Sequence, residues 1–236
     1  MLKAIFFDLD DTLENWGLAK NAIRNEFCKF IEKEYGINNK KFFKKFVEVE
    51  YDIVGRSLNP TNYSRYVWLK ETFRRFKKKI SEKELRNLDK LYWKIAYANI
   101  KPYPDTKSTL LKLKKYKKAI ITDSDGDLGD EIKNKKISLI GVRKYFDVIV
   151  TSNMTGKNKP DKRLWKIALK KLGVKPSECI MVGDKPEMDL KPAKEMGFAT
   201  AWMKRGHWAS LRKGKRFKYV DFEIKKLSQL LKILKK

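Results

Sequence analysis

The sequence predicts an α/β protein in which a Rossmann-like core with a parallel sheet is interrupted by an all-helical insert. Apolar runs of strand length alternate with helical patterns from residue 105 onward, as in a series of βαβ units. Residues 17–98, by contrast, carry only helical periodicity. Because a first strand precedes this helical segment, the core domain is expected to comprise residues 1–16 and 99–236, and the helical domain residues 17–98.

The first strand is expected at residues 4–7, an apolar run that Asp8 and Asp10 follow directly. Side chains alternate along a strand, so Asp8 and Asp10 point to one side and Leu9 points toward the core. Ligands of open parallel sheets bind beyond the carboxyl ends of the strands, which makes both carboxylates candidate functional groups. The alternative is a plain turn, since Asp and Thr also favour turns and helix caps.

The insert is expected to be helical because apolar residues recur at helical spacing in four of its stretches. These residues are Ile23, Phe27, Phe30 and Ile31; Phe42, Phe43, Phe46, Val49 and Ile53; Tyr66, Leu69, Phe73 and Phe76; and Leu85, Leu88, Leu91 and Ile95. Ser81 and Glu84 form a capping-box pattern that opens the last of these helices. Pro102 and Pro104 then enforce an extended break.

Short apolar runs in the remainder of the chain predict the other strands of the sheet. They are expected at residues 119–122, 148–151, 179–182 and 200–203, with a weaker strand near 219–222. Helices with regularly spaced leucine and isoleucine separate them, and Gly173 and Gly197 are expected to end two of these helices. A final amphipathic helix at residues 227–234 is expected to pack on the sheet.

Composition excludes two classes of protein. A chain with 42% hydrophobic and 12% aromatic residues is too apolar to remain disordered. Its longest apolar runs are far shorter than the roughly 20 residues that span a bilayer. No secretion signal is visible, which makes the cytoplasm the expected location. Cys28 and Cys179 lie among apolar neighbours and are expected to be buried thiols rather than a disulfide.

The chain carries 56 Lys and Arg against 29 Asp and Glu, a formal net charge of +27. Such a charge could attract anionic substrates, bind nucleic acid, or reflect a lysine-rich proteome. The lysines are scattered over predicted helix faces, which is typical of solvated surfaces rather than of one nucleic-acid groove. Residues 212–218 form the densest basic patch. Nucleic acid is therefore not the expected partner, and the sequence leaves open whether the chain forms a homo-oligomer.

Further polar side chains follow other predicted strands. Thr122 and Asp123 end one strand, Lys159 precedes a helix after the next, and Asp184 and Asp189 follow a third. Taken singly, each has an ordinary explanation as a turn residue, surface lysine or helix cap. Taken together on this strand pattern, they are expected to meet at one edge of the sheet, because the carboxyl ends of parallel strands lie together.

These four patterns resemble the four motifs of the haloacid dehalogenase-like (HAD) hydrolase superfamily: Asp-x-Asp-x-Thr, a strand-end Thr, a Lys before a helix, and Gly-Asp-x-x-x-x-Asp. The helical insert is similar to the cap of subfamily I members. Segments 120–123, 151–160, 174–189 and 219–234 are similar to the archaeal HAD phosphatases often called glyceraldehyde 3-phosphate phosphatases. The resemblance implies a HAD-like core with a helical cap and a phosphatase acting on a small phosphorylated substrate, with a phosphosugar or triose phosphate favoured.

The first motif has the residue types for two-step phosphate hydrolysis. Asp8 would attack phosphorus and hold the phosphoryl group as an acyl phosphate. Asp10 would act as general acid toward the leaving oxygen and then as general base toward water. This role needs a protonated Asp10, which neighbouring carboxylates are expected to favour by raising its pKa. Mg²⁺ prefers oxygen ligands, so Asp8, the backbone carbonyl of Asp10 and Asp184 are the expected metal ligands.

The remaining motif residues are expected to bind and orient the phosphate. Thr122 and backbone N–H groups near Asp123 would bind its oxygens, while Lys159 would offset the transferred negative charge. Asp189 is expected to orient Lys159 or a metal-bound water without touching the substrate itself.

Alternatives to a phosphatase remain open. A phosphomutase or a nucleotidase would share these motifs, and a basic nucleic-acid-binding protein could retain the fold without activity. An acid at Asp10 disfavours dehalogenation, because the family's dehalogenases lack an acid there.

Several residues depart from the family pattern or are given no catalytic role. Glu14 stands where an apolar residue is usual. Asp125 and Asp127 are expected to cap a helix rather than bind a cation. His207, the sole histidine, is not expected to be catalytic.

Overall fold

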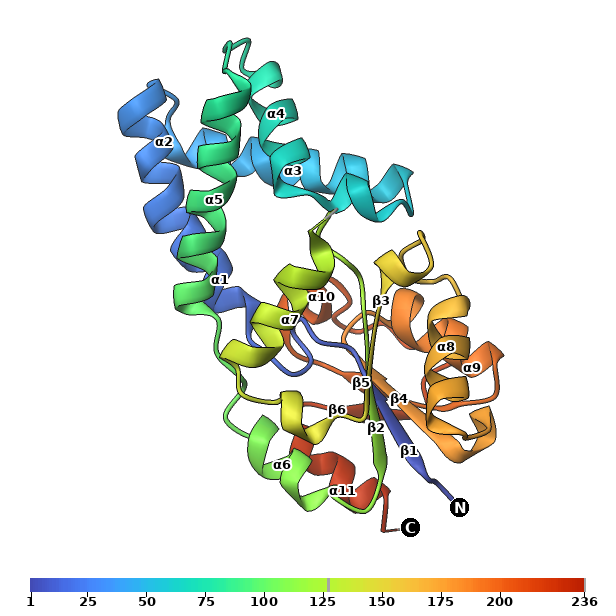
Figure 1. Cartoon of the computed structure of the whole chain (residues 1–236). Coiled ribbons are helices and arrows are strands. Elements are labelled where there is room, and N and C mark those ends of the chain that lie inside the picture. Colours follow the sequence, from blue (N-terminus) through green and yellow to red (C-terminus); the bar gives the residue numbers. More distant parts are fainter. Residues whose placement is uncertain (127, 236) are drawn as a thin grey trace.

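Six parallel strands form the centre of the computed structural model, which describes residues 1–126 and 128–235 (Figure 1). They are β1 (Ala4–Phe7), β2 (Lys117–Thr122), β3 (Val148–Thr151), β4 (Cys179–Gly183), β5 (Ala199–Met203) and β6 (Phe222–Ile224). The order β3-β2-β1-β4-β5-β6 places β1 between β2 and β4, in register from Ala4 to Phe7. The expected α/β fold with a parallel, Rossmann-like sheet is confirmed.

The strand bounds match the expectation closely except at the last strand. We predicted a strand near residues 219–222, whereas β6 pairs with β5 only from Phe222 onward. The preceding residues are held by side-chain bonds instead: the Thr200 hydroxyl donates to the backbone carbonyl of Tyr219 at 2.7 Å, and the Asp221 carboxylate accepts from the Thr200 amide at 2.9 Å. These bonds delay the start of strand pairing.

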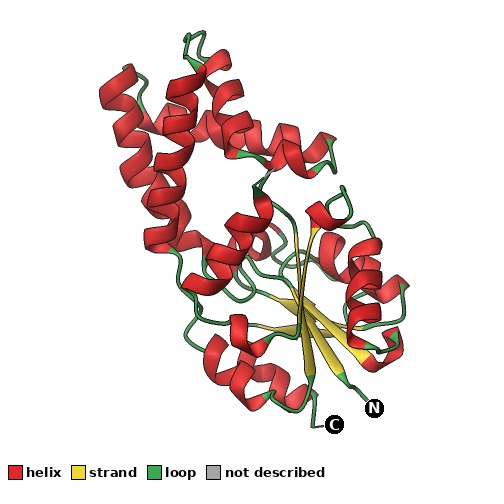
Figure 2. Ribbon diagram, viewed as in Figure 1, coloured by secondary structure: helices red, strands yellow, loops and turns green. Residues whose placement is uncertain are grey.

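Helices cover both faces of the sheet (Figure 2). They are α6 (Thr106–Lys112), α7 (Gly129–Leu139), α8 (Arg163–Leu172), α9 (Lys191–Glu195), α10 (Gly206–Leu211) and α11 (Leu230–Ile233). On β1, Ile5 and Phe7 belong to one apolar cluster and Ala4 and Phe6 to the other, as strand alternation requires. Among the described helices, none combines the length and apolarity needed to cross a bilayer.

The insert between β1 and β2 consists of helices that pack around aromatic side chains (Figure 1). They are α1 (Trp16–Ala22), α2 (Cys28–Tyr35), α3 (Asn39–Arg56), α4 (Arg65–Arg75) and α5 (Glu82–Asn99). A π-helical turn at Ile23–Phe27 divides the first predicted helical stretch into α1 and α2. Phe42 lies at the centre, with ring contacts to Phe27, Phe46 and Phe73.

The two segments that join the insert to the sheet run side by side. The Asn15 amide donates to the Lys101 carbonyl at 2.9 Å, and the Tyr103 amide donates to the Leu13 carbonyl at 3.2 Å. Glu14 forms an isolated bridge with Pro102 between these two bonds. Since Glu14 lies four residues after Asp10, the insert is attached directly beside the carboxyl end of β1.

Both cysteines are buried free thiols, as expected. Burial raises the pKa of Cys28 and of Cys179 to about 12. The two thiols are therefore protonated at neutral pH and have little nucleophilic character.

We expect Ser81→Ala to destabilise the protein by about 1 kcal/mol, because it removes the cap of α5. Ser81 accepts a hydrogen bond from the Glu84 amide, and the Glu84 carboxylate accepts one from the Ser81 amide. Differential scanning calorimetry should show a melting temperature lower by about 2–4 °C. Lys83→Ala, an exposed change in the same turn, is the control and should not lower it. An unchanged Ser81→Ala melting temperature would contradict the assigned cap.

Candidate active site

The carboxyl ends of the central strands bring the predicted motif residues together. Asp8 follows β1, Asp123 follows β2, Asp184 follows β4, and Lys159 lies in the loop between β3 and α8. Asp189 lies in a π-helical turn at Pro186–Leu190, a geometry that recurs at functional sites. Asp8, Asp184 and Asp189 are buried, and each offers a carboxylate oxygen within 4.8 Å of the others.

Lys159 is the cation at the centre of this group. Its Nζ lies 2.6 Å from Asp8 Oδ1 and 2.6 Å from Asp189 Oδ1, and its backbone amide donates to Asp123 Oδ1 at 2.7 Å. Burial lowers the pKa of Lys159, but the charges of Asp189, Asp8 and Asp123 outweigh it and raise the pKa well above its usual value. Lys159 is therefore a fixed positive charge beside Asp8.

Asp184 differs from its neighbours because both of its carboxylate oxygens are buried without a hydrogen-bond partner in the described part of the chain. Its backbone carbonyl, in contrast, accepts a bond from Trp202 Nε1 at 3.1 Å, which fixes the residue in place. Burial, with the nearby charges of Asp8 and Asp189, raises the pKa of Asp184 well above its usual value. A buried, unpaired carboxylate beside two others offers the oxygen donors that a hard cation takes.

Asp189 has both oxygens engaged within the protein. Oδ1 contacts Lys159, and Oδ2 accepts from the Lys185 amide at 3.0 Å. Burial raises the pKa of Asp189 to about 6, against the opposing charge of Lys159. These contacts agree with the expectation that Asp189 orients Lys159, which stays a prediction.

Asp10 faces two buried lysines of α7. Lys133 Nζ lies 2.6 Å from Asp10 Oδ2, and Lys136 Nζ contacts Asp10 Oδ1. Burial would raise the pKa of Asp10, but these two ammonium groups hold it well below its usual value. The expectation that neighbouring carboxylates raise the pKa of Asp10 is therefore wrong, because the nearest charges are positive.

Lys133 and Lys136 were not predicted to belong to the site. They are three residues apart on α7 and face the sheet edge, where Lys136 also pairs with Glu14 at 2.6 Å. Glu14 is fully buried, so its departure from the family pattern is matched by a buried cation. Burial and the charge of Asp10 raise the pKa of Glu14 well above its usual value, with Lys136 opposing. The signal in the sequence was Glu14, a carboxylate at a position that is usually apolar. A carboxylate that is buried requires a cationic or hydrogen-bonding partner, which pointed to a lysine or arginine elsewhere in the chain.

Asp125 does not cap a helix, contrary to our prediction. Among the described residues, no side chain caps the start of α7 after Leu128, and Asp125 instead pairs with Arg65 at 2.6 Å and with Lys133 at 2.8 Å. The acidic stretch after β2 therefore supplies a counter-charge for buried cations. Asp127, for which we made the same prediction, lies outside the described residues.

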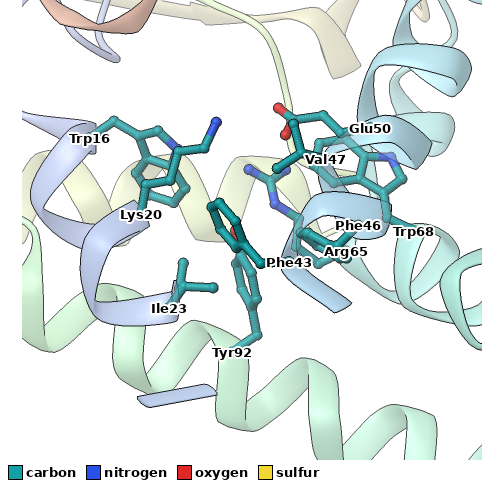
Figure 3. A pocket seen from close by; sticks show the side chains of 10 residues that line it. All are labelled: Trp16, Lys20, Ile23, Phe43, Phe46, Val47, Glu50, Arg65, Trp68 and Tyr92. Atoms are coloured by element: carbon teal, nitrogen blue, oxygen red, sulfur yellow. The ribbon is translucent and has the colours of Figure 1, made fainter. Parts of the chain in front are cut away.

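Arg65, the first residue of α4, is a buried charge that the insert contributes. Its guanidinium lies 4.4 Å from the ring centroid of Trp68 and 5.0 Å from that of Trp93. Figure 3 shows Arg65 among aromatic side chains from several insert helices, with the Glu50 carboxylate and the Lys20 ammonium directed toward the same space. Arg65 also was not predicted, since an arginine at a helix start looks like a surface residue.

A cleft of about 620 Å³, including its open mouth, lies between the insert and the sheet edge. Its charged lining comprises Asp10, Asp11, Glu50, Asp123, Asp125 and Asp184 against Arg65, Lys133 and Lys185. Carboxyl groups thus outnumber cations in the cleft of a strongly basic chain, which disfavours a bound polyanion and favours a cation.

Lys185 is a further cation in the cleft that we did not predict. Burial lowers its pKa, but the charge of Asp184 outweighs this effect and raises the pKa above its usual value. Thr122, which we predicted to bind phosphate, ends β2 and is buried, with its hydroxyl 3.4 Å from the Asp123 carbonyl. Asp123 and Ser124, which follow it, line the cleft. The role of Thr122 stays a prediction.

His207 lies where the insert meets α10, away from the carboxylate cluster. Its Nε2 is 2.6 Å from the Tyr51 hydroxyl of α3. Burial lowers the pKa of His207. The contact is one between the insert and the core, and the absence of a catalytic role for His207 stays a prediction.

Comparison with known families identifies the chain. The profile described as haloacid dehalogenase-like hydrolase matches residues 2–197. The chain belongs to this hydrolase family. The motif residues of the HAD-like hydrolases thus lie in one site, with Lys159 joining Asp8 to Asp189.

Individual relatives agree with this assignment over the whole chain. The glyceraldehyde 3-phosphate phosphatase of Methanocaldococcus jannaschii is 31% identical, with 100% of this chain and 98% of that protein covered. The protein of the same name from Pyrococcus furiosus is 32% identical, with 100% and 94% covered. A crystal structure of a HAD phosphatase from Thermococcus onnurineus has a TM-score of 0.70 and 26% identity, with 99% and 98% covered.

We expect Gly183→Ala to destabilise this HAD-like hydrolase by about 1–3 kcal/mol through overpacking. A Cβ at Gly183 would lie 2.5 Å from Asp189 Oδ2 and 2.6 Å from Asp189 Cβ, so the π-helical turn would have to shift. Thermal unfolding followed by circular dichroism measures the effect. The control is Gly55→Ala in α3, where a Cβ meets no atom within 4 Å and the melting temperature should not fall. Equal melting temperatures for both variants would refute the close packing.

Proposed function

We propose that this hydrolase is a Mg²⁺-dependent phosphatase that removes the phosphoryl group from a small phosphorylated metabolite. In this proposal residues 1–16 and 99–236 form the catalytic core, and residues 17–98 form a cap over it. The observation that carries the proposal is the buried group of Asp8, Asp184 and Lys159: a nucleophile, an unpaired carboxylate and a fixed cation within one site. The cleft between the insert and the sheet edge, which Asp10, Asp123 and Asp184 line, is the proposed substrate site.

Asp8 is the proposed nucleophile. Lys159 binds Asp8 Oδ1, which leaves Oδ2 to form a bond to phosphorus while the bond from phosphorus to the leaving oxygen breaks. Water then attacks the aspartyl phosphate and releases inorganic phosphate, which restores Asp8. Lys159 stays protonated throughout and offsets negative charge on the transferred group.

Asp10 is the proposed proton carrier of both steps. It gives a proton to the leaving oxygen in the first step and takes one from water in the second. Lys133 and Lys136 lower the pKa of Asp10 in the free protein, so the first step requires Asp10 to take up a proton from solvent before the leaving group departs.

The residues fit a bound Mg²⁺. Asp8, Asp184 and the backbone carbonyl of Asp10 would hold the ion, and the two free oxygens of Asp184 are the main support for this assignment. When bound, Mg²⁺ would neutralise negative charge between Asp8 and the incoming phosphate. Asp189 is already bonded to Lys159 and to the Lys185 amide, so its proposed role is to position Lys159.

The substrate class rests on the relatives. Two proteins about 30% identical over the full chain are named glyceraldehyde 3-phosphate phosphatases, which favours a triose phosphate or another phosphosugar here. A nucleotidase or a phosphomutase of the same fold is the alternative. A catalytically idle nucleic-acid-binding protein is disfavoured, because carboxyl groups predominate in the cleft.

We expect Mg²⁺-dependent phosphate release that is lost with Asp8→Asn, by about a thousandfold or more in kcat, because the nucleophile is removed. The assay measures phosphate released from triose phosphates, phosphosugars, nucleoside monophosphates and p-nitrophenyl phosphate, with and without EDTA. Asp161→Asn, which alters an exposed ion pair with Arg163, is the matched control and should retain activity.

Turnover that survives both EDTA and Asp8→Asn would refute the mechanism. If the protein prefers nucleoside monophosphates, the proposed substrate is a nucleotide and not a phosphosugar. Transfer of the phosphoryl group to a second position of a sugar phosphate, without net phosphate release, would indicate a mutase.

Mg²⁺ binding should weaken as the pH falls. Burial raises the pKa of the proposed ligand Asp184 well above its usual value, so a proton competes with the ion for its carboxylate at low pH. Isothermal titration calorimetry at pH 5.0 and 7.5 should show affinity falling by about tenfold per pH unit for each proton released. Asp161→Asn should show the same dependence. Equal Mg²⁺ affinity at both pH values would contradict the assignment of Asp184 as a metal ligand with a raised pKa.

A further inference from the structure

We propose that Arg65 and Asp125 are positioning residues that act through Lys133 to orient the carboxylate of Asp10, so that the location of the insert sets the geometry of proton transfer. This inference rests on the proposed function, because it concerns the role assigned there to Asp10. It extends that function by assigning the insert a part in the chemistry, beyond covering the cleft.

The three contacts form a continuous chain from the insert to Asp10. Arg65 Nη1 lies 2.6 Å from Asp125 Oδ1, and Asp125 Oδ2 lies 2.8 Å from Lys133 Nζ. The same Lys133 Nζ lies 2.6 Å from Asp10 Oδ2. Asp125 uses a different oxygen for each partner, so it bridges the two cations and fixes the distance between them.

Because these ion pairs are buried, the position of each side chain depends closely on that of its neighbour. The side chains of Arg65, Asp125 and Lys133 are 8%, 7% and 2% exposed. A partner that moved away would leave its neighbour a poorly compensated buried charge, so each ion is expected to remain with its neighbour. A shift of Arg65 would be passed on to Lys133 and hence to the Asp10 oxygen that Lys133 binds.

Arg65 follows the insert because its guanidinium is held there on several sides. It lies 4.4 Å from the ring centroid of Trp68 and 5.0 Å from that of Trp93, and it donates to the Tyr63 carbonyl at 2.9 Å. Figure 3 shows Trp16, Trp68 and Tyr92 around the same side chain. The guanidinium therefore moves with α4 and α5 rather than independently of them.

The second oxygen of Asp10 is also connected to the insert. Lys136 contacts Asp10 Oδ1 and pairs at 2.6 Å with Glu14, which lies in the segment leading into α1. Lys136 Nζ is 4.2 Å from the ring centroid of Trp16, the first residue of α1. Both oxygens of Asp10 are thus held by lysines whose other partners lead into the insert, which is the arrangement expected of a group oriented from outside the core.

The test compares substrates that need an acid with one that does not. Arg65→Gln should lower kcat for the alkyl phosphate that the panel ranks first by about tenfold or more beyond its effect on p-nitrophenyl phosphate, whose good leaving group needs little protonation. Asp125→Asn should do the same, with KM little changed. Arg65→Lys, which keeps the charge, should restore part of the loss.

Arg74→Gln is the matched control, because Arg74 lies on the same helix and pairs with Glu71 while 73% exposed. This variant should leave kcat unchanged for both the alkyl phosphate and p-nitrophenyl phosphate. If Arg65→Gln fails to fold, the double variant Arg65→Met with Asp125→Asn removes both charges and leaves neither ion unpaired. Circular dichroism verifies folding, and the double variant should show the same dependence on the leaving group.

An equal loss on both substrates in a folded variant, or a change confined to KM, would overturn the proposal and leave Arg65 a structural residue. Failure of the proposed function is recognised separately. In that case the wild type releases no phosphate from either substrate, or Asp10→Asn itself fails to discriminate between the alkyl and the aryl phosphate.

Discussion

Neutralisation of buried negative charge at the carboxyl end of the sheet is the constraint on which the rest of the structure depends. Asp8 and Asp189 are buried there, the carboxylate of Asp10 is partly exposed, and isolated buried ions are destabilising by several kcal/mol each. The compensating cations come from separate parts of the chain: Lys159 from the β3–α8 loop, and two lysines from α7. Folding of the loop and of α7 is therefore tied to the formation of the site.

Much of the fold could be predicted because it follows from local pattern. The apolar runs at β1 and β3 defined these strands, and the capping box at Ser81 and Glu84 marked the start of α5. The motif residues could be placed together because parallel strands share one carboxyl edge. Where side-chain bonds displaced strand pairing, as Thr200 does before β6, the predicted bound was wrong.

The charge network escaped prediction because a buried lysine and a solvated one look alike in a sequence. Lys133 and Lys136 belong to a lysine-rich helix, and only tertiary packing decides that they face inward. The same holds for Asp125, whose partner Arg65 is 60 residues away, so that local rules favoured a helix cap. Because the partners of these charges are remote, the pKa of Asp10 also could not be predicted from its neighbours in the chain.

The paired attachment of the insert has an evolutionary consequence. Asn15 and Lys101 are hydrogen-bonded neighbours, so the chain leaves the sheet and returns to it at one point. A unit that enters and exits at adjacent residues can be exchanged or reshaped by recombination without changing the strand order, in the way that domain insertions are accommodated. Here such exchange is constrained, because a replacement unit would also have to supply the counter-charge that Arg65 provides to Asp125. Exchange of the insert as a whole is therefore coupled to this ion pair.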